Sequence, residues 1–228
     1  MSRFTFRVAI AFLAFTVGVA ATALWFFSSK PFPDSRKPFP DRTKVAVSNS
    51  ASISQKVESQ LKPVAGDRSE PLFAETINER AKEANLFPLK SKKLNRDDLE
   101  FQVWVGFGKK PLEGFVIKRV AAQWEGTFLE SINLTTKPPY RKQLSPPKSG
   151  WEQFWSQLLD AGLLSLPDSS QLKDEVEVFD GTSYVVEVKK DGVYRTYAYM
   201  NPDYQKWAEA KQMLRIADIL YTELGIAK

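Results

Sequence analysis

The longest apolar stretch of the sequence is residues 8–27, in which twenty consecutive residues carry no charge. At about 1.5 Å of rise per residue, a helix of this length crosses a hydrocarbon core of roughly 30 Å. The stretch is also longer than the roughly 7–15 apolar residues of a signal peptide. We therefore predict a single-pass transmembrane anchor. The alternative is a cleaved signal peptide, because Ala21 and Ala23 form a small-x-small pair that resembles a cleavage site.

The segments on either side of this stretch predict its orientation and a tether. Residues 1–7 form a short basic tail, which usually stays cytoplasmic and would place the rest of the chain outside the membrane. Residues 28–68 contain Lys-Pro-Phe-Pro-Asp at 30–34 and again at 37–41, followed by a polar tract without periodicity. Because proline fixes φ and removes a donor, we expect a Pro/Ser-rich flexible linker. The repeat is read as a spacer rather than as a docking motif for an aromatic groove.

The pattern after residue 68 predicts a single α+β domain, residues 69–228. Its elements are expected to form an antiparallel sheet of about five strands packed against two or three helices. Strands are predicted where apolar and polar residues alternate or apolar residues gather: 99–107, with one buried face, 115–120, 123–132, 177–189 and 193–200. The Asp191-Gly192 pair predicts a tight hairpin between the last two. Four prolines at 138, 139, 146 and 147 are expected to interrupt any regular element between the third and fourth strands.

Three helices complete the expected domain. The first covers 71–85, capped by Ser69. The second begins at Ser149, with a capping box to Glu152, and ends at Gly162. The third is long and begins at Asn201-Pro202. The middle helix carries an amphipathic stripe that predicts core packing rather than a ligand site: Trp151, Phe154, Trp155, Leu158 and Leu159.

Composition restricts the chemistry that this domain can perform. The chain has neither His nor Cys, which excludes thiolate nucleophiles, Ser-His-Asp triads and ordinary zinc sites. Carboxylate, Lys and Tyr chemistry remain. The net charge of +5 lies entirely in residues 1–70, whereas residues 71–228 hold 22 basic and 22 acidic residues. A neutral domain does not favour a nucleic-acid partner, and basic residues beside a membrane segment suit anionic lipid.

Three segments are candidate sites, and each of them also fits a structural role. The densest acidic group is Asp174, Glu175, Glu177 and Asp180, which could hold a divalent cation or act as acid and base, although its spacing favours a solvated loop. The segment Asp180-Gly181-Thr182-Ser183 could bind an anion through its N–H groups, but it is typical of a turn. Gly106-Phe107-Gly108 is too short for a dinucleotide fingerprint. The sequence therefore assigns no catalytic residue, no metal site and no cofactor.

Three stretches, at 103–124, 151–168 and 180–202, together resemble a group of uncharacterised bacterial membrane-anchored proteins. The resemblance spans roughly residues 99–224. It implies the same organisation and a bacterial origin, and it carries no activity, cofactor or site residue.

Two classes of function remain open at this point. The first, which we favour, is a binding or interaction module tethered to the membrane and directed at an envelope protein or cell-wall partner, because a tether raises the local concentration of the domain. The second is a hydrolase or lyase that uses carboxylate, Lys or Tyr side chains. The sequence does not predict an oligomeric state.

Overall fold

The computed structural model describes residue 61 and residues 66–108, 111–131, 140–173 and 176–227, which lie in one compact unit. The predicted tail, the predicted transmembrane helix and most of the predicted linker fall outside these residues. In the part of the chain that is described, no helix is both long and apolar enough to cross a membrane. The described residues confirm the α+β fold class.

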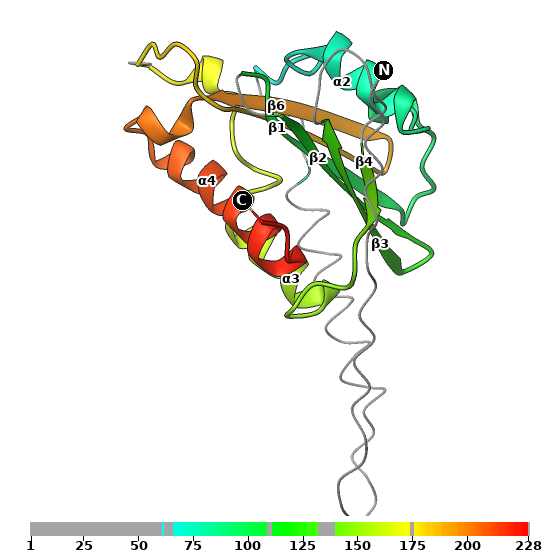
Figure 1. The fold of residues 1–228 in the computed structure, drawn as a ribbon. Coiled ribbons are helices and arrows are strands. Elements are labelled where there is room, and N and C mark those ends of the chain that lie inside the picture. Colours follow the sequence, from blue (N-terminus) through cyan, green and yellow to red (C-terminus); the bar gives the residue numbers. More distant parts are fainter. Residues whose placement is uncertain (1–60, 62–65, 109–110, 132–139, 174–175, 228) are drawn as a thin grey trace, which may run out of the picture. The chain divides into compact units, whose positions relative to one another are not determined.

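Six strands form one sheet, in which every pairing is antiparallel (Figure 1). Their order across the sheet is β4-β3-β2-β1-β5-β6. Four consecutive strands form a meander, and the hairpin of the last two attaches to it through the pairing of β1 with β5. The strands are β1 (Leu99–Gly106), β2 (Leu112–Val120), β3 (Gln123–Ser131), β4 (Tyr140–Gln143), β5 (Ser183–Lys190) and β6 (Val193–Met200).

Two α-helices cover one face of the sheet: α3 (Trp151–Asp160) and α4 (Ala208–Leu224) (Figure 1). The predicted stripe of α3 faces the core, and Trp155 is fully buried with its ring centroid 5.6 Å from that of Phe101. This packing confirms that the aromatic side chains of α3 belong to the core, with only Trp151 partly exposed. The residues of β5 that face these helices are Tyr184, Val186 and Val188, as the alternation predicts.

One helix, α2 (Ala74–Glu83), packs on the opposite face of the sheet (Figure 1). Ile77 and Ala81 of this helix pack against Trp104 of β1 and Val185 of β5. Every residue of β1 is consequently buried. The prediction of one buried face for this strand is therefore wrong, because alternation identifies the apolar face but does not show what covers the polar one.

The hairpin between β5 and β6 is confirmed. Asp191 and Gly192 both have positive φ, at 51° and 76°, as a type I′ turn requires. The turn between β2 and β3 has the same length and also uses two positive φ values, but they fall on Ala121 and Ala122. The Ala121 amide donates to Asp98 Oδ1 at 3.2 Å, which supports this less favourable turn.

Several predicted boundaries are wrong. The sheet has six strands, because the short exposed β4 lies between the prolines that were expected to prevent regular structure. Among the described strands it pairs with β3 alone, which makes it an edge strand of the sheet. The strand expected at 177–189 begins only at Ser183, and the final helix begins at Ala208, after a 3₁₀ turn, η3 (Pro202–Tyr204), that uses the Asn-Pro signal.

The predicted N-terminal caps of the first two helices are also wrong, whereas Gly162 ends α3 as predicted, with a φ of 94° just after the last helical turn. The α2 cap is Phe73 in the left-handed region, and the α3 cap is Gly150; neither cap residue makes a side-chain hydrogen bond. The Glu152 carboxylate accepts instead from Trp124 Nε1 at 2.9 Å. Tertiary contacts thus replace the local bonds that a capping box would supply.

Candidate functional site

A pocket of about 320 Å³ lies at one end of the sheet, on the face covered by α4. The polar side chains of its lining come from β2, from the loop before β5, from β5 and from α4. The other lining residues are apolar or glycine. The lining residues are Val105, Gly106, Pro111, Glu113, Thr182, Tyr184 and Tyr221.

Strand register builds this pocket. Val105 of β1 pairs with Glu113 of β2 on one side and with Tyr184 of β5 on the other, so the three side chains form a row on one face. Tyr221 reaches the row from the last turns of α4, and its hydroxyl donates to Glu113 Oε2. A glycine is required beside the row, because a Cβ on Gly106, at a φ of 133°, would lie 2.7 Å from the Pro111 carbonyl oxygen.

Both pocket tyrosines hold their protons tightly. Burial, with further contributions from Asp203 and Glu113, raises the pKa of Tyr184 to about 12. Burial and the hydrogen bond to the Glu113 carboxylate also raise the pKa of Tyr221. At neutral pH both phenols are therefore neutral hydrogen-bonding groups, and neither is suited to act as a general base.

The Asp180-Gly181-Thr182-Ser183 segment forms part of the same end of the domain. The Asn201 amide donates to the Thr182 carbonyl at 3.0 Å. Gly181 lies against the Asn201 side chain so closely that a Cβ at 181 would be 1.5 Å from Oδ1. The segment is thus a packed turn before β5, and its Thr182 lines the pocket.

The predicted acidic group lies only partly within the described residues. Asp174 and Glu175 lie outside the described residues, and Glu177 and Asp180 are exposed. Among the described residues, no group of three or more Asp or Glu side chains is placed to hold a metal ion. Gly106 is the last residue of β1, and the Phe107 ring after it stacks on Phe73 at 4.5 Å.

A buried polar cluster lies on the α2 face of the sheet, and we call it the Glu187 cluster. Glu187 accepts from Tyr194 Oη at 2.7 Å and from Trp104 Nε1 at 3.3 Å. Glu100 accepts from Lys92 Nζ at 2.5 Å and from Gln102 Nε2 at 2.9 Å. The cluster consists of Glu187, Tyr194, Trp104, Glu100, Gln102 and Lys92.

The contacts of Glu187 do not fully offset the unfavourable effect of burial on its ionised form. Burial raises its pKa, and the nearby Glu100 carboxylate adds to that rise; the hydrogen bonds from Tyr194 and Trp104 offset only part of it. Such a carboxyl is a candidate acid when it lines a cleft. Glu187 is not among the residues that line either described pocket, so we assign it a structural role.

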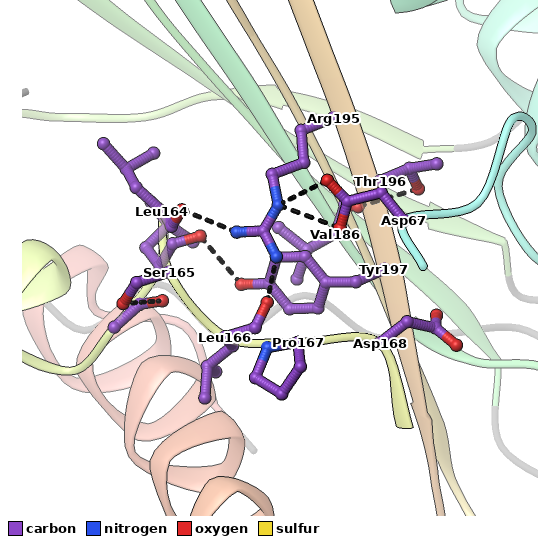
Figure 2. A network of polar contacts seen from close by, with 12 residues as sticks. Asp67, Leu164, Ser165, Leu166, Pro167, Asp168, Val186, Arg195, Thr196 and Tyr197 are labelled. Carbon is purple, nitrogen blue, oxygen red and sulfur yellow. Dashed lines mark hydrogen bonds and ion pairs between the residues drawn. The ribbon is translucent and has the colours of Figure 1, made fainter. Parts of the chain in front are cut away.

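A second buried polar cluster lies along β6, and we call it the Arg195 cluster (Figure 2). Arg195 is almost fully buried; its Nε donates to Asp67 Oδ2 at 2.9 Å and its Nη1 to the Leu164 carbonyl at 2.5 Å. Asp168 accepts from Arg68 Nε at 2.8 Å and from the Ala198 amide at 2.9 Å. The cluster consists of Arg195, Asp67, Arg68 and Asp168.

The Arg195 cluster protects the edge of the sheet. The amide of Ala198 in β6, the last strand of the sheet, is satisfied by the Asp168 carboxylate rather than left for another strand. Tyr197 and Tyr199 donate from β6 to the carbonyls of Leu163 and Pro167, at 2.9 and 2.8 Å. These bonds hold the segment after α3 against β6. We therefore assign the Arg195 cluster a structural role.

The surface of the domain also has an apolar groove of about 580 Å³ beside α2. Leu86, Phe87 and Pro88 supply its apolar lining, and the Phe87 side chain is 74% exposed. Exposed apolar surface of this kind can mark a contact site. None of the polar clusters described above lies in this groove.

Comparisons of the sequence and the structure with protein-family models, curated proteins and solved structures find no match. The pocket at the end of the sheet must therefore be interpreted from its own chemistry.

Sequence reasoning missed this pocket. Tyr184 and Tyr221 appear in the sequence as apolar positions of a strand and a helix, and Glu113 as one polar residue in a predicted turn. Of the lining residues, only Gly106 and Thr182 lie in segments that the sequence marks as candidates, and each of these segments points to a different ligand class. The signal that joins them is strand register, which depends on pairings between residues more than seventy positions apart.

Proposed function

We propose that this chain is a membrane-anchored binding protein whose α+β domain acts through the pocket at the end of the sheet. The observation that carries the proposal is the convergence of Glu113, Tyr184, Tyr221 and Thr182 on one cavity with apolar walls. Cavities that combine apolar walls with a few fixed polar groups are typical of ligand sites. In this proposal residues 8–27 supply the anchor, and the part of the predicted linker before Leu61 supplies the tether, with the domain outside the cytoplasm.

The pocket can be tested by photo-crosslinking of the full chain in native membranes. A photoreactive residue replaces Pro111, an exposed residue of the pocket lining, and in a matched protein it replaces Glu79, an exposed residue of α2. We expect an adduct from position 111 that is absent from position 79 and is weakened by Glu113→Gln. Equal labelling from both positions would contradict a role for the pocket.

The anchor is tested by carbonate and high-salt washing of membranes. The full chain is expected to stay in the membrane fraction, because residues 8–27 are uninterrupted by charge. A soluble form with an N-terminus near Ala21 to Leu24 would show instead that the segment is a cleaved signal peptide.

The alternative, a carboxylate enzyme, has one observation in its favour, which is the hydrogen bond between Tyr221 and Glu113 in the pocket. The high pKa values of both tyrosines count against a phenolate base. Esterase, phosphatase, glycosidase and peptidase substrates are therefore expected to show no turnover. Turnover that is lost in Glu113→Gln while the fold is intact would favour the enzyme.

A further inference from the structure

Exposed apolar side chains gather at one end of the domain, on two segments of the chain. Among the described residues, eight large hydrophobic side chains are exposed, and four of them lie within residues 176–179 or 200–204. We call these four the tip patch: Val176, Phe179, Met200 and Tyr204, of which Phe179 is 89% exposed and Tyr204 60%. Apolar side chains that gather in this way mark an interaction site, whereas single exposed ones need no explanation.

Hydrogen bonds hold the two segments of the tip patch side by side. Figure 1 shows the loop before β5 and the segment after β6 at the same end of the sheet. The buried Gln205 side chain accepts from the Val176 amide and donates to the Val176 carbonyl, each at 2.9 Å. Asn201 Nδ2 donates to the Val178 carbonyl at 2.8 Å. The loop that carries Phe179 therefore has a fixed shape before it meets a partner, which lowers the entropy lost on binding.

The charges around the tip patch do not favour an anionic partner. The exposed charged residues described at 173–180 and 200–206 are of both signs: Lys173, Glu177, Asp180, Asp203 and Lys206. Attraction to an anionic surface depends on an excess of Lys and Arg, which these segments do not have. A partner of the patch must therefore be held by burial of the apolar side chains themselves.

The length of the tether allows this patch to reach the bilayer. The described chain begins at Leu61, which is buried in the core, so residues 28–60 remain as the tether of the proposed function. A flexible chain of this length spans roughly 30 Å, which is about the diameter of a small domain. Any face of the domain can then meet the membrane, and the tether gives the bilayer a high local concentration.

We infer that the tip patch is a membrane contact site, in which Phe179 and Tyr204 enter the interfacial region of the bilayer to which the chain is anchored. Aromatic rings are favoured at this depth, and the Tyr hydroxyl can stay among the polar headgroups. The inference rests on the anchor of the proposed function and adds a second contact with the membrane. Because Thr182 follows the patch loop and lines the pocket, the contact would bring the pocket close to the bilayer.

The test uses the full chain reconstituted in phosphatidylcholine liposomes, after carbonate washing has shown that it is incorporated. The chain has no Cys, so Glu177→Cys on the tip loop or Glu79→Cys on α2 supplies one exposed position for an NBD label. A phosphatidylcholine with a doxyl quencher near its headgroup reports contact of the label with lipid. Phe179→Ser and Phe179→Trp change the patch. Phe87→Ser is the matched control, because Phe87 is 74% exposed in the groove beside α2.

We expect the doxyl lipid to quench the label at position 177 strongly and the label at position 79 weakly. Phe179→Ser should shift the equilibrium of the contact roughly tenfold or more toward the free domain, which is the scale of burying one large apolar side chain. Phe179→Trp should keep the quenching, and Phe87→Ser should not change it. Added phosphatidylglycerol or salt should have little effect, because the contact is apolar. Thermal unfolding checks that each variant is folded.

The other outcomes overturn the inference in distinguishable ways. If carbonate extracts the chain from the liposomes, the anchor of the proposed function fails and this inference fails with it. If the chain is incorporated but position 177 is quenched no more than position 79, or Phe179→Ser leaves the quenching unchanged, the inference fails and the proposed function stands. Quenching that requires phosphatidylglycerol would show attraction by charge instead. Label emission that rises with the protein-to-lipid ratio, without quenching by lipid, would show that a second copy covers the patch.

Discussion

Two buried carboxyl groups next to the β5–β6 hairpin have pKa values that shift in opposite directions. Asp168 lies beside β6 in the Arg195 cluster, and Glu187 lies on β5 in the Glu187 cluster. Burial by itself favours the neutral form of both groups and so acts to raise both pKa values. For Asp168, the Arg68 guanidinium and the amides of Ser170 and Ala198 outweigh burial and lower its pKa. For Glu187, the pKa stays raised.

The difference shows that burial alone does not decide the charge of a carboxyl group. Asp168 receives one cationic donor and two backbone N–H groups, which all favour the ionised form. Glu187 receives two neutral donors, a phenol and an indole, and has the Glu100 carboxylate nearby. The ionised groups of the Arg195 cluster therefore stabilise the fold at the edge of the sheet. An ionised Glu187, in contrast, lowers the stability of the folded state.

The largest effect is expected from Arg195→Met, which keeps the apolar stem and removes the guanidinium. The change leaves Asp67 without this partner and two carbonyls, of Leu164 and Leu166, without their donor. Breaking a buried ion pair costs about 3–5 kcal/mol. Chemical denaturation should show this loss in the free energy of unfolding. A loss below about 1 kcal/mol would show that the Arg195 cluster contributes little to stability.

The next effect concerns the start of the domain. Asp67 and Arg68 belong to the predicted linker, but they pair with Arg195 and Asp168, and Leu61 is buried in the main core. A chain that starts at Ser69 is still expected to fold. It should be less stable than one that starts at Leu61 by about 3 kcal/mol, since a buried Arg195 loses its counter-ion. Equal stability in urea would show that these pairs contribute nothing.

Asp168→Asn tests the charge of the same cluster with little change of shape. The ionised carboxylate stabilises the fold at pH values above its ordinary pKa of 3.8, and this contribution is lost as the pH falls through the lower pKa of the folded state. The variant should lose about 2 kcal/mol at pH 7, the scale of a charged hydrogen bond. Its deficit should shrink at about pH 3, and a deficit that is constant with pH would refute the charge argument.

Glu187→Gln should have the smallest effect and the opposite sign. Because the folded state raises the pKa of this group above its ordinary 4.5, stability falls as the pH rises through the window above that value. An uncharged amide should avoid this loss and stabilise the domain by about 1 kcal/mol at pH 7, while still accepting one hydrogen bond. Thermal unfolding from pH 4 to 8 measures this gain in stability. A variant that is less stable than the native domain at pH 7 would contradict the claim that the charge of Glu187 destabilises the fold.

The strands and their faces could be predicted from the sequence where local periodicity was strong. Alternation located β1, and the Asp191-Gly192 pair located the final hairpin, because a type I′ turn depends on neighbouring residues only. The stripe of α3 predicted its buried face, including Trp155. The fold class follows from these elements. The absence of His and Cys, and the neutral charge of residues 71–228, are also properties of the sequence alone.

Only the tertiary structure decided which polar residues meet. Glu113, Tyr184 and Tyr221 form one pocket because β1 pairs with both β2 and β5 and because α4 crosses above them. Asp67 reaches Arg195 across 128 positions of the chain. A local pattern records the polarity of each residue, whereas strand register and helix packing set the distances between residues far apart in sequence. Those distances determine the direction in which the pKa values of Asp168 and Glu187 shift, and the chemistry of the pocket.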